Sequence, residues 1–175
     1  MNRGTLAATI YQTAHLTGTF RLRSGATSSE YFDKYRFESD PQLLAAIAAA
    51  LANLVPPGVE VLGGLELGGV PLATQLSQVT GLPTLFVRKA AKSYGTCQLA
   101  EGGVVEGRTI LLVEDVVTSG GQVVESAEAL RRLGAVITDA LCVIDREAGG
   151  SEALAAAGIR LHPLFRMSEL KGAAA

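Results

Sequence analysis

The chain has 175 residues and a mass of 18.1 kDa, the size of one domain with a single core. Hydrophobic residues make up 48% and charged residues 18%, which excludes a chain that is mostly disordered. A net charge of −2 and a pI near 5.7 argue against a general nucleic-acid binder, which would need a basic face. The longest apolar stretch, Leu43 to Val55, is shorter than the roughly 20 residues of a membrane span.

The amino terminus and the cysteines predict a cytoplasmic protein. Met1 to Thr9 has no basic region followed by an apolar stretch, so no signal peptide is expected. Cys97 and Cys142 are too few for a disulfide framework and lack metal-ligand spacing. We expect two free thiols, with Cys142 in the core and Cys97 exposed.

The first 40 residues predict a small cap. A helix is expected from about Leu6 to Leu16, followed by two β-like segments, Phe20 to Leu22 and Tyr31 to Phe37. No linker composition separates this cap from the rest, so we expect one domain over residues 1–175 with the cap at 1–40 and the core at 41–170.

After the cap, short β-branched runs alternate with helical patterns, which predicts an α/β fold with a parallel sheet covered on both faces. Asp40 before Pro41 predicts a capped start for an Ala-rich helix, and Gly134 predicts the end of a later helix. The tail Lys171 to Ala175 is expected to fray. The expected strands are Val59–Leu62, Thr84–Val87, Thr109–Val113, Ile137–Ile144 and Ile159–Leu164, and the expected helices between them are Val70–Val79, Gln122–Leu133 and Ser151–Ala157.

The most informative motif runs from Ile110 to Gly121. Four apolar residues predict a buried strand, and Glu114 and Asp115 follow at its carboxyl end, the edge where open α/β sheets bind ligands. Thr118 to Gly121 place hydroxyls and backbone N–H groups at a helix N-terminus, which favours a phosphate. Because carboxylates accept hydrogen bonds from vicinal hydroxyls, the motif predicts a ribose 5-phosphate site.

This motif resembles the signature for 5-phosphoribosyl-1-diphosphate (PRPP) in the type I phosphoribosyltransferases. That signature is an apolar strand, two acids, two apolar residues and Thr-x-Gly. Gly121 departs from it, because Thr is frequent at that position. The resemblance implies the type I fold, with a central, mostly parallel five-stranded sheet and an N-terminal hood. It also implies that PRPP is bound by Glu114, Asp115, Val116, Val117, Thr118, Ser119, Gly120, Gly121 and Gln122.

A second motif places three cations, Arg88, Lys89 and Lys92, within five residues. Alone it is equally typical of a solvated charged loop. With Tyr94 and Gly95 it resembles the catalytic loop of the orotate phosphoribosyltransferases, which is flexible and reaches into the other subunit of a homodimer. The resemblance implies that Arg88, Lys89, Lys92 and Tyr94 contact PRPP, that Lys92 and Asp115 are the catalytic residues, and that the segment Arg88 to Gly103 is shared across the interface. The family commonly has His where this chain has Tyr94.

The cap carries a third resemblance, because Phe20-x-Leu22-x-Ser24-Gly25 and Tyr31-Phe32-Asp33-Lys34 are similar to the hood that covers orotate in that family. Taken singly, Arg23 is better explained as a surface charge, Tyr31 and Phe32 as cap core, and Asp145-Arg146 as a surface ion pair. A planar guanidinium with paired donors suits a carboxylate. The implied orotate-binding residues are Arg23, Tyr31, Phe32, Thr118 and Arg146.

The Gly-rich stretch Gly63 to Pro71 resembles the family's pyrophosphate loop, in which many relatives have Tyr-Lys at the positions of Leu67 and Gly68. Without that lysine, backbone amides at Leu67 and Gly68 must bind more of the pyrophosphate. A strained or cis peptide near Glu66 to Gly68 is therefore expected. His15 and His162 match no motif and are expected at surface or satisfied polar positions.

Together these resemblances imply transfer of the ribosyl 5-phosphate of PRPP to orotate, giving orotidine 5′-monophosphate and pyrophosphate in pyrimidine (UMP) biosynthesis. Mg²⁺ is the implied cofactor, held mainly through PRPP with no direct protein ligand. PRPP and orotate are the expected partners, with neither nucleic acid nor membrane. Two alternatives stay open: a phosphoribosyltransferase for another nucleobase, and a PRPP-sensing regulator without catalysis.

Overall fold

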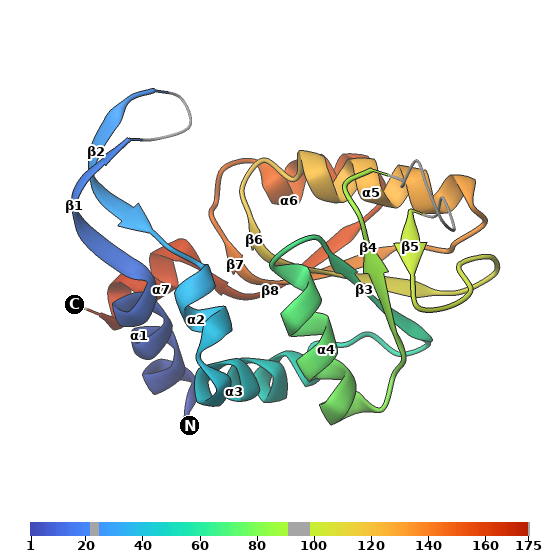
Figure 1. Cartoon of the computed structure of the whole chain (residues 1–175), viewed down its shortest axis with the longest axis horizontal. Coiled ribbons are helices and arrows are strands. Elements are labelled where there is room, and N and C mark those ends of the chain that lie inside the picture. Colours follow the sequence, from blue (N-terminus) through green and yellow to red (C-terminus); the bar gives the residue numbers. More distant parts are fainter. Residues whose placement is uncertain (22–24, 91–98, 175) are drawn as a thin grey trace.

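The computed structural model describes residues 1–21, 25–90 and 99–174. In these ranges a central sheet lies between two helical layers, and a helix with a projecting hairpin forms the cap at one end (Figure 1). The helices are α1 Arg3–Ala14, α2 Tyr35–Ser39, α3 Pro41–Ala52, α4 Gly69–Thr80, α5 Gly121–Arg132, α6 Gly150–Ala156 and α7 Met167–Ala173. The strands are β1 His15–Arg21, β2 Thr27–Phe32, β3 Val61–Leu65, β4 Thr84–Val87, β5 Ala100–Glu101, β6 Ile110–Val117, β7 Asp139–Asp145 and β8 Arg160–Arg166.

The sheet has the order β5-β4-β3-β6-β7-β8 in the described part of the chain. The five strands β4, β3, β6, β7 and β8 are parallel, which confirms the predicted sheet. The antiparallel strand β5 was not predicted, because two residues are too short to show a hydrophobic period. The chain passes from β3 to β4 on one side and later returns to β6 on the other. The carboxyl ends of β3 and β6 therefore form a topological switch point.

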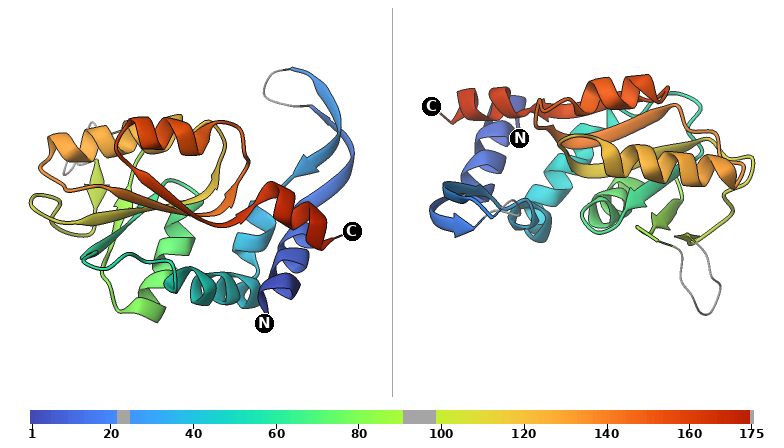
Figure 2. Two further views of the ribbon diagram at one scale, coloured as in Figure 1. Left: turned by 180° about the vertical axis from the view of Figure 1, so that it is seen from behind. Right: turned by 90° about the horizontal axis from the view of Figure 1, so that it is seen from above.

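Alternate residues of the central strand β6 supply the two faces of the core. In β6, Leu111 and Val113 pack with α3 and α4, whereas Ile110 and Leu112 pack with α5 and α6. The two helical layers on opposite faces of the sheet are visible in Figure 2. Cys142 is fully buried on the α5 side as predicted, and burial raises the pKa of its thiol. Cys97 lies outside the described residues.

The cap has the predicted helix and two strands, but their bounds differ: β1 is His15–Arg21 and not Phe20 to Leu22, and β2 is Thr27–Phe32 and not Tyr31 to Phe37. The first helix ends at Ala14, so Leu16 belongs to β1, which pairs antiparallel with β2. Tyr35–Ser39 is the short helix α2 and not part of a strand. The aromatic residues of this segment favour a strand locally, but a helical turn lets Phe37 become completely buried in the core, and packing overrides the local propensity.

The ends of the helices follow their sequence signals with one exception. The Oδ1 atom of Asp40 accepts hydrogen bonds from the backbone N of Gln42 and Leu43, both at 2.9 Å, which confirms the predicted cap of α3. The expected fraying from Lys171 is wrong up to Ala173, because α7 buries Leu170 completely.

No helix in the described ranges combines the length and apolarity needed to cross a membrane.

His162 has a polar partner, as expected, whereas the buried Nε2 atom of His15 has no hydrogen-bond partner among the described residues, which differs from the expectation. The Nε2 atom of His162 is 2.6 Å from Oδ1 of Asp139. The ring of His15 stacks on Tyr11, and its Nε2 lies 3.5 Å from Oε2 of Glu30.

Candidate active site

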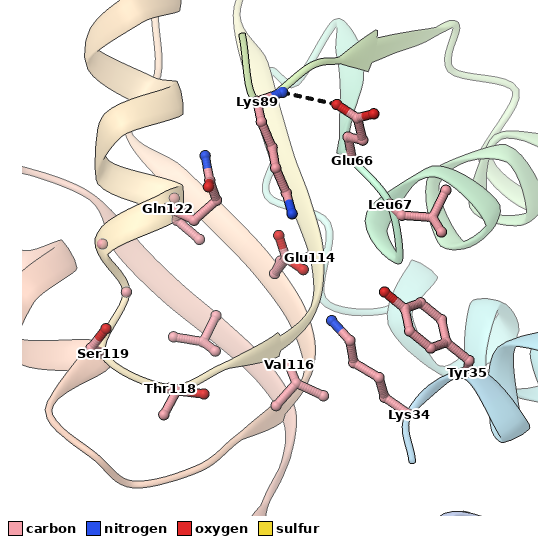
Figure 3. A pocket seen from close by; sticks show the side chains of 14 residues that line it. Lys34, Tyr35, Glu66, Leu67, Lys89, Glu114, Val116, Thr118, Ser119 and Gln122 are labelled. Atoms are coloured by element: carbon pink, nitrogen blue, oxygen red, sulfur yellow. Dashed lines mark hydrogen bonds between the residues drawn. The ribbon is translucent and has the colours of Figure 1, made fainter. Parts of the chain in front are cut away.

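A cavity of about 330 Å³ opens at the switch point between the carboxyl ends of β3 and β6. Figure 3 shows the side chains that converge on it from four parts of the chain: the cap, the turn after β3, the segment after β4, and the end of β6 with the turn into α5. Its lining residues are Lys34, Tyr35, Glu66, Leu67, Lys89, Glu114, Val116, Val117, Thr118, Ser119, Gly120, Gly121, Gln122 and Val123. The PRPP residues predicted from Glu114 to Gln122 therefore line one cavity, with Asp115 excepted.

The turn from β6 into α5 forms one end of the cavity. Gly120 has a φ of +79°, and a Cβ there would lie 2.5 Å from Cδ1 of Leu154. Only glycine avoids both the left-handed strain and this contact. No side chain among the described residues caps α5, and its first turn holds no acid. The first N–H groups of the helix are thus available to an anion such as a phosphate.

The two acids of the motif face different surroundings. Glu114 lines the cavity, as predicted. Asp115 is completely buried and is not among the lining residues described, which differs from the expectation that both carboxylates face the ligand. The Nζ atom of Lys34 lies 2.6 Å from Oδ2 of Asp115 and covers that carboxylate.

Glu38, from α2, completes a buried group of three carboxyls with Glu114 and Asp115. Burial raises the pKa of Glu38 to about 9 and the pKa of Glu114 to about 9, and in both cases contact with Asp115 adds to the shift. Burial opposes ionisation of Asp115 too, but hydrogen bonds from Glu114, Glu38 and Lys34 lower its pKa. At neutral pH Asp115 therefore carries the negative charge, while Glu38 and Glu114 hold protons.

The turn after β3 forms the opposite end of the cavity. The peptide bond between Glu66 and Leu67 is cis, which confirms the expectation for this loop. Leu67 is exposed and lines the cavity. Oε2 of Glu66 accepts a hydrogen bond of 3.0 Å from the backbone N of Lys89, which holds the strand end of β4 beside this turn.

The cationic segment after β4 is described only at its start. The side chain of Lys89 lines the cavity and points toward Glu114 from the side opposite Lys34 (Figure 3). Arg88 is not among the lining residues described, and its Nε lies 3.6 Å from Oε1 of Glu101. Lys92 and Tyr94 lie outside the described residues.

A second cavity of about 290 Å³ lies between the hairpin and the end of β7. Tyr31, Phe32 and Arg146, all predicted to bind the base, line it together, whereas Thr118 lines the first cavity. The two cavities lie at the ends of two neighbouring strands, β6 and β7. The backbone N of Arg146, after β7, donates a hydrogen bond of 2.9 Å to the carbonyl of Val117, at the end of β6. Arg23 lies outside the described residues.

Asp145 does not act as a simple surface partner for Arg146. It is 5% exposed, and its carboxylate accepts hydrogen bonds from the backbone N of Glu147 and from Oγ of Ser151. These bonds hold the turn after β7 and thereby the backbone position of Arg146.

Three site residues were not singled out from the sequence: Lys34, Tyr35 and Glu38. Lys34 belongs to the hood motif, but its contact with Asp115 joins the cap to β6 across a large part of the chain, and no local pattern predicts such a pair. Glu38 was not singled out because it lies just after the segment Tyr31 to Phe37, which was predicted to be β-like and not helical. The signal that could have found it is an acid beside a fully buried aromatic residue, Phe37.

Comparison with known proteins agrees with this geometry. The model of the phosphoribosyl transferase domain matches residues 36–157, more than half of the chain. An orotate phosphoribosyltransferase from a Nocardioides species is 52% identical over 169 residues, covering 97% of this chain and 94% of that protein. The chain belongs to the orotate phosphoribosyltransferase family. The enzyme of that name from Halobacterium salinarum is 44% identical over 153 residues, with 87% of each chain covered.

Solved orotate phosphoribosyltransferases share the fold. The Mycobacterium tuberculosis enzyme in complex with Fe(III) dicitrate has a TM-score of 0.87 at 31% identity, covering 96% of this chain and 98% of that one. The same enzyme in complex with PRPP has a TM-score of 0.82 at 28% identity, covering 97% and 98%. The chain is thus a phosphoribosyltransferase with a type I fold.

Proposed function

We propose that the chain transfers the ribosyl 5-phosphate of PRPP to orotate, giving orotidine 5′-monophosphate and pyrophosphate in pyrimidine biosynthesis. One observation carries the proposal: a single cavity has an anion cradle at one end and a lysine on each of two opposite sides, Lys34 and Lys89, with Glu114 between them. A ligand that fits it has a phosphate, a polyol and a second anionic group in that order, as PRPP has.

PRPP fits with its 5-phosphate on Thr118 to Gly121 and its ribose hydroxyls beside Glu114. The diphosphate then faces the turn Glu66 to Gly68 and Lys89. Breaking the bond between C1 and the diphosphate leaves positive charge on the ribose and negative charge on the leaving group. Cations placed at the leaving group stabilise the transition state more than the ground state. Lys92, by family resemblance, joins them. No covalent intermediate with the enzyme is required.

Orotate is assigned to the side of the second cavity. There the guanidinium of Arg146 supplies paired donors for a carboxylate, and Tyr31 and Phe32 supply flat apolar surfaces for the ring. Thr118, at the neighbouring strand end, lies on the side from which the base must approach C1. Positioning the base and the sugar in this way replaces an encounter in solution.

Mg²⁺ is proposed as the cofactor, bound mainly through PRPP. Magnesium is usually held by one or two carboxylates together with substrate phosphates. Glu114 is the carboxylate at the polyol position of the cavity, so it is the residue that fits such an ion, in its ionised form. Bound there, Mg²⁺ would neutralise charge on the diphosphate.

We also propose a cytoplasmic homodimer in which the segment Arg88 to Gly103 acts in the partner's site. The free thiol of Cys142 suits a reducing compartment. Mixing a Lys92→Ala variant with a Glu114→Gln variant tests the shared site, since a mixed dimer would contain one site with both residues intact. Activity above that of either variant alone supports sharing, and no gain on mixing contradicts it.

The reaction itself is tested by the loss of orotate absorbance when PRPP and Mg²⁺ are added, repeated without each component. The proposal expects loss only in the complete mixture, with pyrophosphate released. A parallel panel of adenine, guanine, hypoxanthine and uracil separates the alternative base specificities. Turnover of another base but not orotate would overturn the specificity, and PRPP binding without pyrophosphate release would favour the regulator.

A further inference from the structure

Lys34 has a position that its sequence context does not explain. It lies between the hairpin and α2, far along the chain from β6, yet its Nζ is 2.6 Å from Oδ2 of the completely buried Asp115. Its side chain is 32% exposed, and that exposed part lines the cavity. Figure 3 shows the ammonium directed into the space beside Glu114. Lys34 is therefore a cation of the PRPP cavity that is supplied by the cap.

The pyrophosphate turn is shaped around this contact. A Cβ built on Gly68 would overlap the carboxylate of Asp115 and would lie 2.8 Å from Oε1 of Glu38. Any side chain at position 68 would thus begin in the space occupied by the group that Lys34 binds. A lysine at position 68 would therefore be incompatible with the observed position of the Asp115 carboxylate, to which Lys34 is paired. In this chain the cation comes from the cap, and the turn carries none.

The charge balance of the corner depends on Lys34. Glu38, Glu114 and Asp115 lie together. Among the described residues, Lys34 is the cation that forms an ion pair with this group, through Asp115. The turn Glu66 to Gly68 adds one more acid and no base. Without Lys34, a diphosphate beside this turn would face carboxyl groups on the cap side of the cavity. Lys89, on the opposite side, would be the cation left in the described lining. A multiply charged anion is strongly disfavoured in such surroundings.

We propose that Lys34 is a catalytic residue of this enzyme, whose ammonium is held ready by Asp115 and donates hydrogen bonds to the diphosphate of bound PRPP. It then stabilises the negative charge that the leaving pyrophosphate gains as its bond to C1 breaks. This inference rests on the proposed function and assigns the leaving-group contact on the cap side of the cavity.

The test measures binding of PRPP and of magnesium pyrophosphate by calorimetry, together with kcat and KM. Lys34→Met removes the charge and keeps the length, Lys34→Arg keeps the charge, and Arg36→Met is the matched control on the exposed side of α2. We expect Lys34→Met to weaken both ligands about tenfold or more, with Lys34→Arg closer to wild type. Arg36→Met should stay within about twofold. PRPP affinity within about twofold of wild type in a folded Lys34→Met protein overturns the inference.

A second measurement needs no variant. Native protein is treated with an amine acetylating reagent with and without magnesium pyrophosphate, and each lysine is quantified by mass spectrometry. Pyrophosphate should protect Lys34 and leave the exposed Lys171 unchanged, and equal labelling of Lys34 in both conditions overturns the inference. These readouts use no orotate, so a wrong base assignment leaves them intact. A wild-type protein that binds no PRPP overturns the proposed function and this inference with it.

Discussion

The turn after β6 allows a sharp test, because Gly120 combines a special backbone conformation with a crowded site. Its φ is +79°, and a Cβ there would lie 2.5 Å from Cδ1 of Leu154 and 3.0 Å from the carbonyl oxygen of Gly150. Gly149 has a similar φ of +87° but no atom within 4 Å of its Cβ position. Replacing each by Ala therefore separates backbone strain from steric overlap.

The magnitudes follow from these two terms. An Ala in the left-handed region costs about 1–2 kcal/mol relative to Gly, partly offset by about 0.4–1 kcal/mol from a less flexible unfolded chain. Gly149→Ala should therefore lower the free energy of unfolding by about 0–1.6 kcal/mol. Gly120→Ala carries the same term plus about 1–3 kcal/mol for overpacking against Leu154 and Gly150. Its loss should be about 1–5 kcal/mol in all.

Urea unfolding followed by circular dichroism measures the two losses. In the same proteins, Gly120→Ala should raise the KM for PRPP, because relief of the overlap moves the phosphate turn, whereas Gly149→Ala should not. The two variants losing the same stability, to within about 0.5 kcal/mol, would refute the steric part of the argument. An unchanged KM in Gly120→Ala would refute the role of this turn as the phosphate cradle.

The remaining predictions concern charge and specificity. A native pKa of about 9 for Glu38 means that the folded state holds a proton that the unfolded state loses above its ordinary pKa of 4.5, so stability falls as pH rises between these values. Glu38→Gln should flatten that fall and stabilise the protein at pH 7 by up to about 3 kcal/mol; an unchanged slope in urea titrations at pH 5 to 8 contradicts this. Lys92→Ala should lower kcat far more than it raises the KM for orotate, and unchanged turnover would refute its assigned role. Arg146→Gln should raise the KM for orotate about tenfold or more and leave that for PRPP unchanged, with the exposed Arg160→Gln as control; equal shifts for both substrates would count against a base-specific contact. Removing Mg²⁺ with EDTA should abolish turnover, and added MgCl₂ should restore it; full activity in EDTA would argue against the cofactor.

Local patterns were enough to predict most of the core. The alternation of β-branched runs and helical spacing predicted the five parallel strands, because a strand buried on both faces reads as an apolar run. The Asp40-Pro41 cap predicted the start of α3. The order of strand, acids, small-residue turn and helix in Ile110 to Gly121 predicted the phosphate cradle, since all these groups are neighbours in the chain.

What sequence alone determined is thus the local pattern: a small-residue turn at a helix start, an adjacent pair of acids and an arginine at the end of a strand. Only the tertiary structure decided how these groups face one another. It turned Asp115 inward to Lys34 and made Tyr35–Ser39 helical so that Phe37 and Glu38 are buried. The physical reason is that burial and charge pairing depend on contacts between the cap, the β3 turn and β6, whose free energy outweighs local propensity and leaves no periodic trace in the chain.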